Sequence, residues 1–290
     1  MKISVAQLIV QFLEEIKVPY LFGLSGHSIF AITDALYGAA NVQFIPAMHE
    51  LSAAYMAAAY AKGTRTLGAC TASAGAGVTN LLTGIAYAYK ESIPVIVLAA
   101  DVSRHHAGKG ASSWHEIPQR EMFEPVTKSS VTVENAAQAV DALRRALNEA
   151  TTGRRGPVYV GIPRDTQVQE IEAPGSGWLA TVATIQNPAP AVLDQAAEEL
   201  QKASAPVIIG GGGRLLVEGG RRTSRACRAS LSAFWYYAIA QRLDLRRSFP
   251  FSRSAGFRRI SICQLLLSGF RRDSCGGRNF QRGPHARLWR

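Results

Sequence analysis

Six residues near the start of the chain decide its fold: Val18-Pro19-Tyr20-Leu21-Phe22-Gly23. This run is short and almost continuously apolar, and comparable runs follow it at residues 42–46, 66–71, 94–99 and 157–162. Short apolar strands that alternate with helices are typical of a parallel sheet covered on both faces. We therefore predict an α/β fold built on a doubly wound parallel sheet.

The segments between these runs carry apolar residues at helical spacing. The spacing predicts helices over residues 5–16, 29–37, 50–62, 78–89 and 134–150. Gly63 directly follows the third of these segments and is expected to end that helix. Ligands of such sheets bind beyond the carboxyl ends of the strands. This rule points to three loops, at residues 23–28, 46–50 and 71–77.

Composition divides the chain into four parts. We expect one domain at residues 1–168, followed by a linker at 169–188 where proline and glycine are frequent. A further helix and strand pattern indicates that a second α/β domain begins at residues 189–213. From 214 to 290 the alternation is lost, and we expect an irregular arginine-rich tail with little order.

The net charge of +11 belongs to that tail. Residues 1–213 hold 15 Lys and Arg against 18 Asp and Glu, whereas residues 214–290 hold 17 Arg, no Lys and three acids. The tail shows no pattern that would organise its arginines, so a specific nucleic-acid partner is not expected; steeply salt-dependent binding would indicate one. With no long apolar run, signal peptide or paired cysteine motif, we expect a cytoplasmic protein without a membrane or zinc site.

Five motifs then follow one another in a fixed order. They are Phe22-Gly23-Leu24-Ser25-Gly26, Met48-His49-Glu50, Ala74-Gly75-Ala76-Gly77-Val78-Thr79-Asn80, Pro125-Val126-Thr127-Lys128 and Gly156-Pro157-Val158-Tyr159-Val160-Gly161-Ile162-Pro163-Arg164-Asp165. Together they resemble the amino-terminal third of the thiamine-diphosphate enzymes related to acetolactate synthase, benzoylformate decarboxylase and oxalyl-CoA decarboxylase. The resemblance covers about residues 3–213. It implies a pyrimidine-binding domain, thiamine diphosphate as the cofactor and a 2-keto acid as the substrate.

Glu50 is the central assignment of this resemblance. In similar enzymes the equivalent glutamate hydrogen-bonds N1′ of the aminopyrimidine ring. A carboxyl that gives its proton to N1′ favours the 4′-imino tautomer, which can take the thiazolium C2 proton and leave the reactive ylide. Such a carboxyl must be protonated near neutral pH, so we expect it in a largely apolar pocket. The alternative is that Glu50 only complements the dipole of a helix beginning there.

The resemblance also implies that Gly26, Ser73, Gly75, Gly77 and Asn80 bind the cofactor. Glycine lets the backbone approach a ring closely. The alternative is an ordinary glycine-rich turn between a strand and a helix. The family usually has Gly-Pro-Gly at the second turn and Pro-Gly in the first loop, where this chain has Gly75-Ala76-Gly77 and Ser25-Gly26.

A larger departure concerns a catalytic side chain. Trp114-His115-Glu116 stands where acetolactate synthases usually carry Phe-Gln-Glu, whose glutamine reaches the active site. His115 can move protons where glutamine cannot, which makes another 2-keto acid reaction or an acyl transfer an alternative to acetolactate synthesis. We predict His115 and the nearby Gln119 as catalytic residues beside Glu50. A solvated loop histidine is the other interpretation of His115.

The superfamily binds Mg²⁺ and the diphosphate through a Gly-Asp-Gly segment in another domain. No Gly-Asp-Gly occurs in the 290 residues, so we expect no metal ligands here. FAD, which some members bind in their central domain, stays open, because the run at 210–213 lacks the spacing of a dinucleotide site. The abrupt change after residue 213 suggests a truncated or frameshifted chain, which the nucleotide sequence around codon 213 would test.

Two functions follow. The first is an incomplete thiamine-diphosphate enzyme that acts on 2-keto acids by decarboxylation, carboligation or acyl transfer. The second is a non-catalytic pyrimidine-domain remnant that pairs with an intact homologue. Because the pyrimidine domain of one subunit meets the diphosphate domain of another in relatives, we expect a homo-oligomer or such a pairing.

Overall fold

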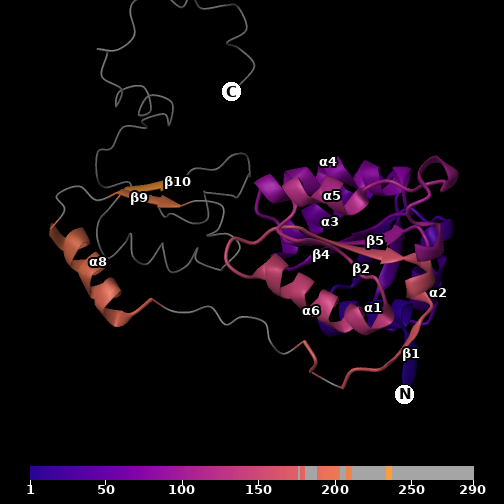
Figure 1. Ribbon diagram of the computed structural model, residues 1–290. Coiled ribbons are helices and arrows are strands. Elements are labelled where there is room, and N and C mark those ends of the chain that lie inside the picture. The colour runs from indigo at the N-terminus through magenta and orange to yellow at the C-terminus, as the bar shows by residue number, and fades with distance from the viewer. Residues whose placement is uncertain (176, 180–187, 203–206, 211–232, 237–290) are drawn as a thin grey trace, which may run out of the picture. The chain divides into compact units, whose positions relative to one another are not determined.

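The computed structural model describes residues 1–175, 177–179, 188–202, 207–210 and 233–236 (Figure 1). Its centre is a six-stranded sheet in the order β3-β2-β4-β5-β7-β6, in which every neighbouring pair is parallel. The strands are β2 (Tyr20–Gly23), β3 (Gln43–Pro46), β4 (Gly68–Thr71), β5 (Val95–Asp101), β6 (Ser130–Thr132) and β7 (Val158–Pro163). This confirms the predicted α/β fold and the five predicted strands, and it adds β6 at one edge.

Helices cover both faces of this sheet. They are α1 (Val5–Glu15), α2 (Phe30–Tyr37), α3 (Glu50–Thr64), α4 (Ala76–Lys90), α5 (Gln119–Phe123), α6 (Ala136–Thr151) and α7 (Arg164–Gln167), with 3₁₀ turns at His27–Ile29, Arg104–His106, Gly110–Ser112 and Glu124–Val126. Helices α1 and α6 lie on one face, and α3, α4 and α5 lie on the other (Figure 1). No helix in the described ranges is both long and apolar enough to cross a membrane.

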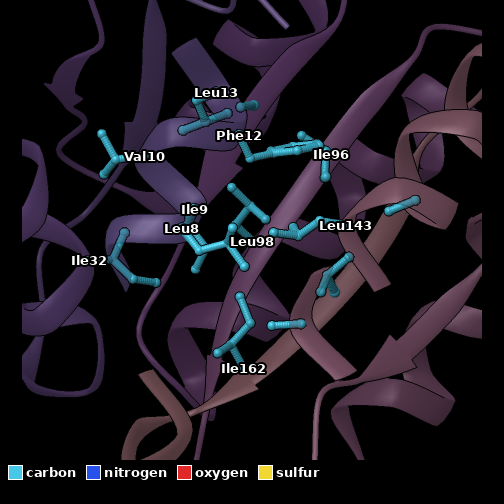
Figure 2. Close-up of a cluster of buried hydrophobic side chains, with 14 of the residues drawn as sticks. Leu8, Ile9, Val10, Phe12, Leu13, Ile32, Ile96, Leu98, Leu143 and Ile162 are labelled. Carbon is cyan, nitrogen blue, oxygen red and sulfur yellow. The ribbon is translucent and has the colours of Figure 1, made fainter. Parts of the chain in front are cut away.

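The central strand β5 shows why its sequence is apolar without a break. Its side chains alternate between the two faces, as those of a strand must. Ile96 and Leu98 join the cluster under α1 and α6, whereas Val95 and Val97 join the cluster under α3 and α4. Figure 2 shows the first cluster, in which residues of α1 and α6 meet the sheet. Both faces of β5 are therefore buried.

Helix α3 packs against α4 through small side chains. Its buried residues are Glu50, Ala53, Ala54, Ala57, Ala58 and Ala61. A Cβ added at Gly84 of α4 would lie 2.5 Å from Cβ of Ala54, so the two helices approach closely there. The expected stop at Gly63 is wrong, because α3 continues through it to Thr64, and the C-cap is Arg65, which has a left-handed backbone (φ 64°). A Cβ at Gly63 would meet nothing within 4 Å, and nothing in its surroundings requires a turn.

A two-stranded antiparallel ribbon accompanies the sheet. It joins β1 (Lys2–Ser4) to β8 (Glu170–Glu172), with Ile3 opposite Ile171. Beyond it, the Trp178 ring lies 6.2 Å from that of Phe12, and Leu179 is buried in the same cluster. Part of the segment predicted as a linker thus packs on the first domain, while the proposed domain boundaries stay predictions.

The segment predicted to begin a second domain contains α8 (Pro190–Lys202) and β9 (Val207–Gly210). Strand β9 pairs in parallel with β10 (Ala233–Tyr236). The rest of the predicted tail lies outside the described residues, and its predicted lack of order stays a prediction.

Candidate functional site

The strand order of the sheet reverses between the neighbouring strands β2 and β4. From β2 it adds β3 on one side, and from β4 it adds β5 and β7 on the other. In open parallel sheets, the carboxyl ends of the strands on either side of such a reversal are where ligands bind. The loops after β2 and β4 meet there so closely that a Cβ at Gly26 would lie 2.6 Å from Cβ of Ser73. Glycine at 26 is required by this contact.

Glu50 lies beside the second of these loops and is turned inward. It is the first residue of α3, and only 8% of it is exposed. Its Oε2 accepts a hydrogen bond of 3.0 Å from Nδ2 of Asn80. A Cβ added at Gly77 would lie 3.0 Å from its other oxygen, Oε1. The carboxyl group is thus held between two residues of α4.

The alternative interpretation of Glu50 concerns the start of α3. There the exposed His49 is the N-cap, and its Nδ1 accepts a hydrogen bond of 3.1 Å from the Leu51 N–H. Glu50 stands in the first turn, where a carboxylate is favoured. Burial and the contact with Asn80 are not needed for that purpose, so the helix dipole alone does not account for this carboxyl.

The turn between β4 and α4 is held by side chains from other loops. Gly75 is the N-cap of α4, with φ 77° and ψ −124°, a conformation that favours glycine. The Ala74 N–H donates to Oγ of Ser28 at 2.8 Å, and the Gly75 N–H donates to Oε1 of Gln119 at 2.7 Å. Ser28 Oγ also lies 2.7 Å from Oγ of Ser73. Two successive backbone donors are therefore already satisfied.

This arrangement limits what the turn can bind. A glycine-rich turn before a helix commonly binds phosphate through free N–H groups. Here Ser28 and Gln119 occupy two of these donors with neutral oxygens. The Ala74 and Gly75 N–H groups are therefore not available to a ligand, while the close backbone approach at Gly75 and Gly77 suits a flat ring that needs one carboxyl partner.

His115 and Gln119 occupy very different positions. His115 is exposed and has a left-handed backbone (φ 75°). Its Cα and Cβ pack on Gly75, because a Cβ at that glycine would lie 2.9 Å from each. Gln119 is only 1% exposed, and its amide is used entirely in contacts within the domain. The structure brings Glu50, Gly77 and Asn80 together, while the catalytic roles of His115 and Gln119 stay predictions.

A polar group that the sequence analysis missed lies at the end of β5. Burial raises the pKa of the Asp101 carboxyl to about 6, although a hydrogen bond from the Val102 N–H and the nearby Gln119 amide act in the opposite direction. The buried Tyr159 hydroxyl accepts from Gln119, and its pKa is also raised by burial. Asp101 follows the predicted strand at 94–99 by two residues, so the carboxyl-end rule could have found it.

The described part of the chain contains no cluster of three or more His, Cys, Asp or Glu side chains that could hold a metal ion. It does contain a buried carboxyl, a glycine turn and two loops in close contact, all at one end of a parallel sheet. Residues 3–126 match the family described as thiamine pyrophosphate enzyme, N-terminal TPP binding domain. Residues 3–126 thus belong to the N-terminal, pyrimidine-binding domain family of the thiamine pyrophosphate enzymes.

Relatives of this pyrimidine-binding domain include acetolactate synthase subunits. The large subunit of Corynebacterium glutamicum is 34% identical over 210 residues, covering 72% of this chain and 33% of that protein. The isozyme 2 large subunit of Escherichia coli K12 is 35% identical over 208 residues, covering 72% and 37%. The large subunit of Haemophilus influenzae is 32% identical over 248 residues, covering 84% and 41%. The chain therefore spans about a third to two fifths of these relatives.

Proposed function

We propose that the pyrimidine-binding domain holds the aminopyrimidine ring of thiamine diphosphate, with Glu50 hydrogen-bonded to N1′, in an enzyme that acts on 2-keto acids. The observation that supports this most strongly is the buried Glu50 carboxyl, which Asn80 holds from one side while Gly77 leaves room at the other. The residues present fit such a ring, because they offer one buried carboxyl and close backbone approach at Gly75 and Gly77.

The contact with Asn80 assigns different tasks to the two Glu50 oxygens. An amide nitrogen only donates, so Oε2 must accept. We infer that a protonated carboxyl carries its proton on Oε1, the oxygen beside Gly77, because a carbonyl-type Oε2 is the better acceptor for Asn80. Oε1 is the atom that would exchange a proton with the ring, and Asn80 keeps the carboxyl oriented for that exchange. The bound cofactor would supply a carbanion that attacks the keto carbon and then serve as an electron sink.

The substrate class and the partners of the whole protein are part of the proposal. The relatives are acetolactate synthases by name, which supports a 2-keto acid as substrate. The diphosphate and Mg²⁺ would be held outside this domain, by a second subunit or a homologue. His115 would be the side chain nearest the turn that could exchange protons with a substrate, since it packs on Gly75.

Cofactor titration of the ¹⁵N-labelled full chain tests this proposal. We expect thiamine diphosphate with Mg²⁺ to shift the amide signals of Gly75 and Gly77 and the Asn80 side-chain signal, at millimolar concentrations because the diphosphate anchor lies elsewhere. Glu50→Gln should weaken these shifts by roughly tenfold, equivalent to about 1.4 kcal/mol. The exposed Glu15→Gln on α1 is the matched control and should bind like the unchanged protein. Equal binding by Glu50→Gln would overturn the assignment.

The non-catalytic alternative is favoured by one observation, the absence of Gly-Asp-Gly from the 290 residues. An assay of pyruvate consumption with cofactor and Mg²⁺ separates the two functions. We expect no turnover by the chain alone, and turnover that depends on Glu50 when it is co-purified with a full-length homologue. A complex that forms without any Glu50-dependent turnover would favour the pairing function.

A further inference from the structure

Gln119 is the buried side chain whose contacts reach the most separate parts of the site. Its Oε1 accepts from the Gly75 N–H at 2.7 Å, and its Nε2 donates to the Ala100 carbonyl at 3.0 Å and to the Tyr159 hydroxyl at 3.3 Å. Because the Gly75 amide can only donate and the Ala100 carbonyl can only accept, the orientation of the Gln119 amide is fixed. One side chain thus joins the ends of β4 and β5 to β7.

The Gly75 end of this bridge determines where α4 begins. The first turn of α4 carries Gly77, and the next carries Asn80; both contact the Glu50 carboxyl. A shift of the helix start would move these two residues together, since they lie on one rigid helix. Gln119 forms no hydrogen bond with Glu50, Gly77 or Asn80 among the described residues, and its one hydrogen bond to the segment that begins α4 is the one at Gly75.

We propose that Gln119 is a positioning residue that fixes the Gly75 turn, and through α4 keeps Gly77 and Asn80 in place against Glu50. The inference rests on the proposed function of Glu50 as the partner of the cofactor ring. We propose this positioning role in place of direct contact between Gln119 and the substrate. The Gln119 side chain is only 1% exposed, and both its amide oxygen and its amide nitrogen already form hydrogen bonds within the domain.

The Gly75 turn has a second attachment that makes the proposal testable. Ser28 holds the neighbouring Ala74 N–H from the loop after β2, independently of Gln119. Loss of the Gln119 amide should therefore loosen the turn without detaching it. We expect a local change at Gly75 and Glu50 rather than unfolding of the domain.

Gln119→Leu keeps the approximate size and removes every hydrogen bond. We expect the Gly75 amide to exchange with solvent at least tenfold faster, the Asn80 side-chain signal to move, and cofactor binding by the folded protein to weaken several-fold. Gln138→Leu is the matched control, because the Gln138 amide oxygen also accepts a backbone N–H, but from Glu134 only four residues away. It should change none of these three measurements.

Gln119→Glu is a second variant, which tests the inference even if Gln119→Leu does not fold. Its hydrogen bonding should match that of glutamine only at low pH, where the glutamic acid is protonated. A protonated glutamic acid can accept from Gly75 and donate to the Ala100 carbonyl, whereas the carboxylate cannot donate. The variant should therefore resemble the unchanged protein in acid. As the pH rises, the carboxylate can still accept from Gly75 but repels the Ala100 carbonyl, so the Asn80 side-chain signal should move and cofactor binding should weaken, with Asp101, Glu116 and Glu121 as the nearby acids. The unchanged protein, which has glutamine at position 119, and the Gln138→Leu control should not show this change with pH.

Two results would overturn the inference. The first is a Gly75 amide that exchanges with solvent at the same rate in Gln119→Leu as in the unchanged protein. The second is a Gly75 amide that exchanges faster in Gln119→Leu while cofactor binding and the Asn80 side-chain signal do not change. Failure of the proposed function looks different, because Glu50→Gln would then bind the cofactor as the unchanged protein does, while the Gly75 and Asn80 signals would still report on Gln119.

Discussion

Helices α1 and α4 begin in contrasting ways. At the start of α1, Ser4 and Gln7 each accept the other's backbone N–H, so a partner lies three residues away. At the start of α4, the acceptors for Ala74 and Gly75 come from Ser28 and Gln119, which lie 46 and 44 residues away. The first arrangement only begins a helix, whereas the second fixes that helix relative to several strands. The helix start that belongs to the candidate site is thus held by side chains from several distant segments at the carboxyl end of the sheet.

The largest expected effect is at Gly75. Gly75→Ala combines a positive φ with a Cβ 2.9 Å from the His115 backbone, so we expect the free energy of unfolding to fall by about 3 kcal/mol. Gly108→Ala is the matched control, since Gly108 has φ 80° and nothing within 4 Å of an added Cβ. It should cost only about 1 kcal/mol. Equal losses in urea unfolding would show that the contact with His115 is not required.

Replacing Ser28 or Ser4 with alanine compares the two kinds of helix start through the same substitution. Ser28→Ala leaves the buried Ala74 N–H without its acceptor and should lower the free energy of unfolding by about 2 kcal/mol. Ser4→Ala removes an exposed local cap and should cost about 1 kcal/mol. Only the first should move the Asn80 side-chain signal. If Ser4→Ala moved it too, the distinction between local and long-range caps would fail.

The smallest expected effect is a gain in stability at Asp101. Burial raises its pKa to about 6 in the folded protein, from 3.8. Between these values the folded state keeps a proton that the unfolded state releases, so stability falls as pH rises from about 4 to about 6 and the loss then stays constant. Asp101→Asn avoids this loss and should be more stable above pH 6 by about 1 kcal/mol, allowing for partial exposure.

Urea midpoints at pH 4 and pH 7.5 measure this effect at Asp101. The variant and the unchanged protein should agree at the lower pH and separate at the higher one. A difference that is the same at both values would mean that the Asp101 carboxyl does not titrate as its burial requires.

Much of the fold was predictable because burial on both faces leaves a clear pattern. Strands such as β5 and β7 are apolar at every position that faces a helix layer. Strand β6 reads Ser130-Val131-Thr132 and has no such pattern, because it lies at a sheet edge and every residue is only partly buried. The ribbon strands β1 and β8 are three residues long and were missed for the same reason.

The candidate site was predictable only where a motif marked it. Glu50, Gly77 and Asn80 lie in recognisable segments, and the structure brings them together. Ser28 gave no signal, because a single loop serine has no periodicity and its partner Ala74 is far away in the sequence. The orientation of Gln119 could not be predicted either, since it depends on three groups that only the folded sheet assembles.

The β1–β8 ribbon has a consequence for how the domain is made. Lys2 lies opposite Glu172, so the first strand of the chain pairs with one of the last segments of the domain to be synthesised. The entropic cost of closing a loop grows only slowly with its length, by about 0.6 kcal/mol per doubling, but contacts between residues so far apart in the sequence form slowly. On the ribosome, β1 therefore waits without its partner until almost the entire domain has emerged, and its pairing marks a late step of folding.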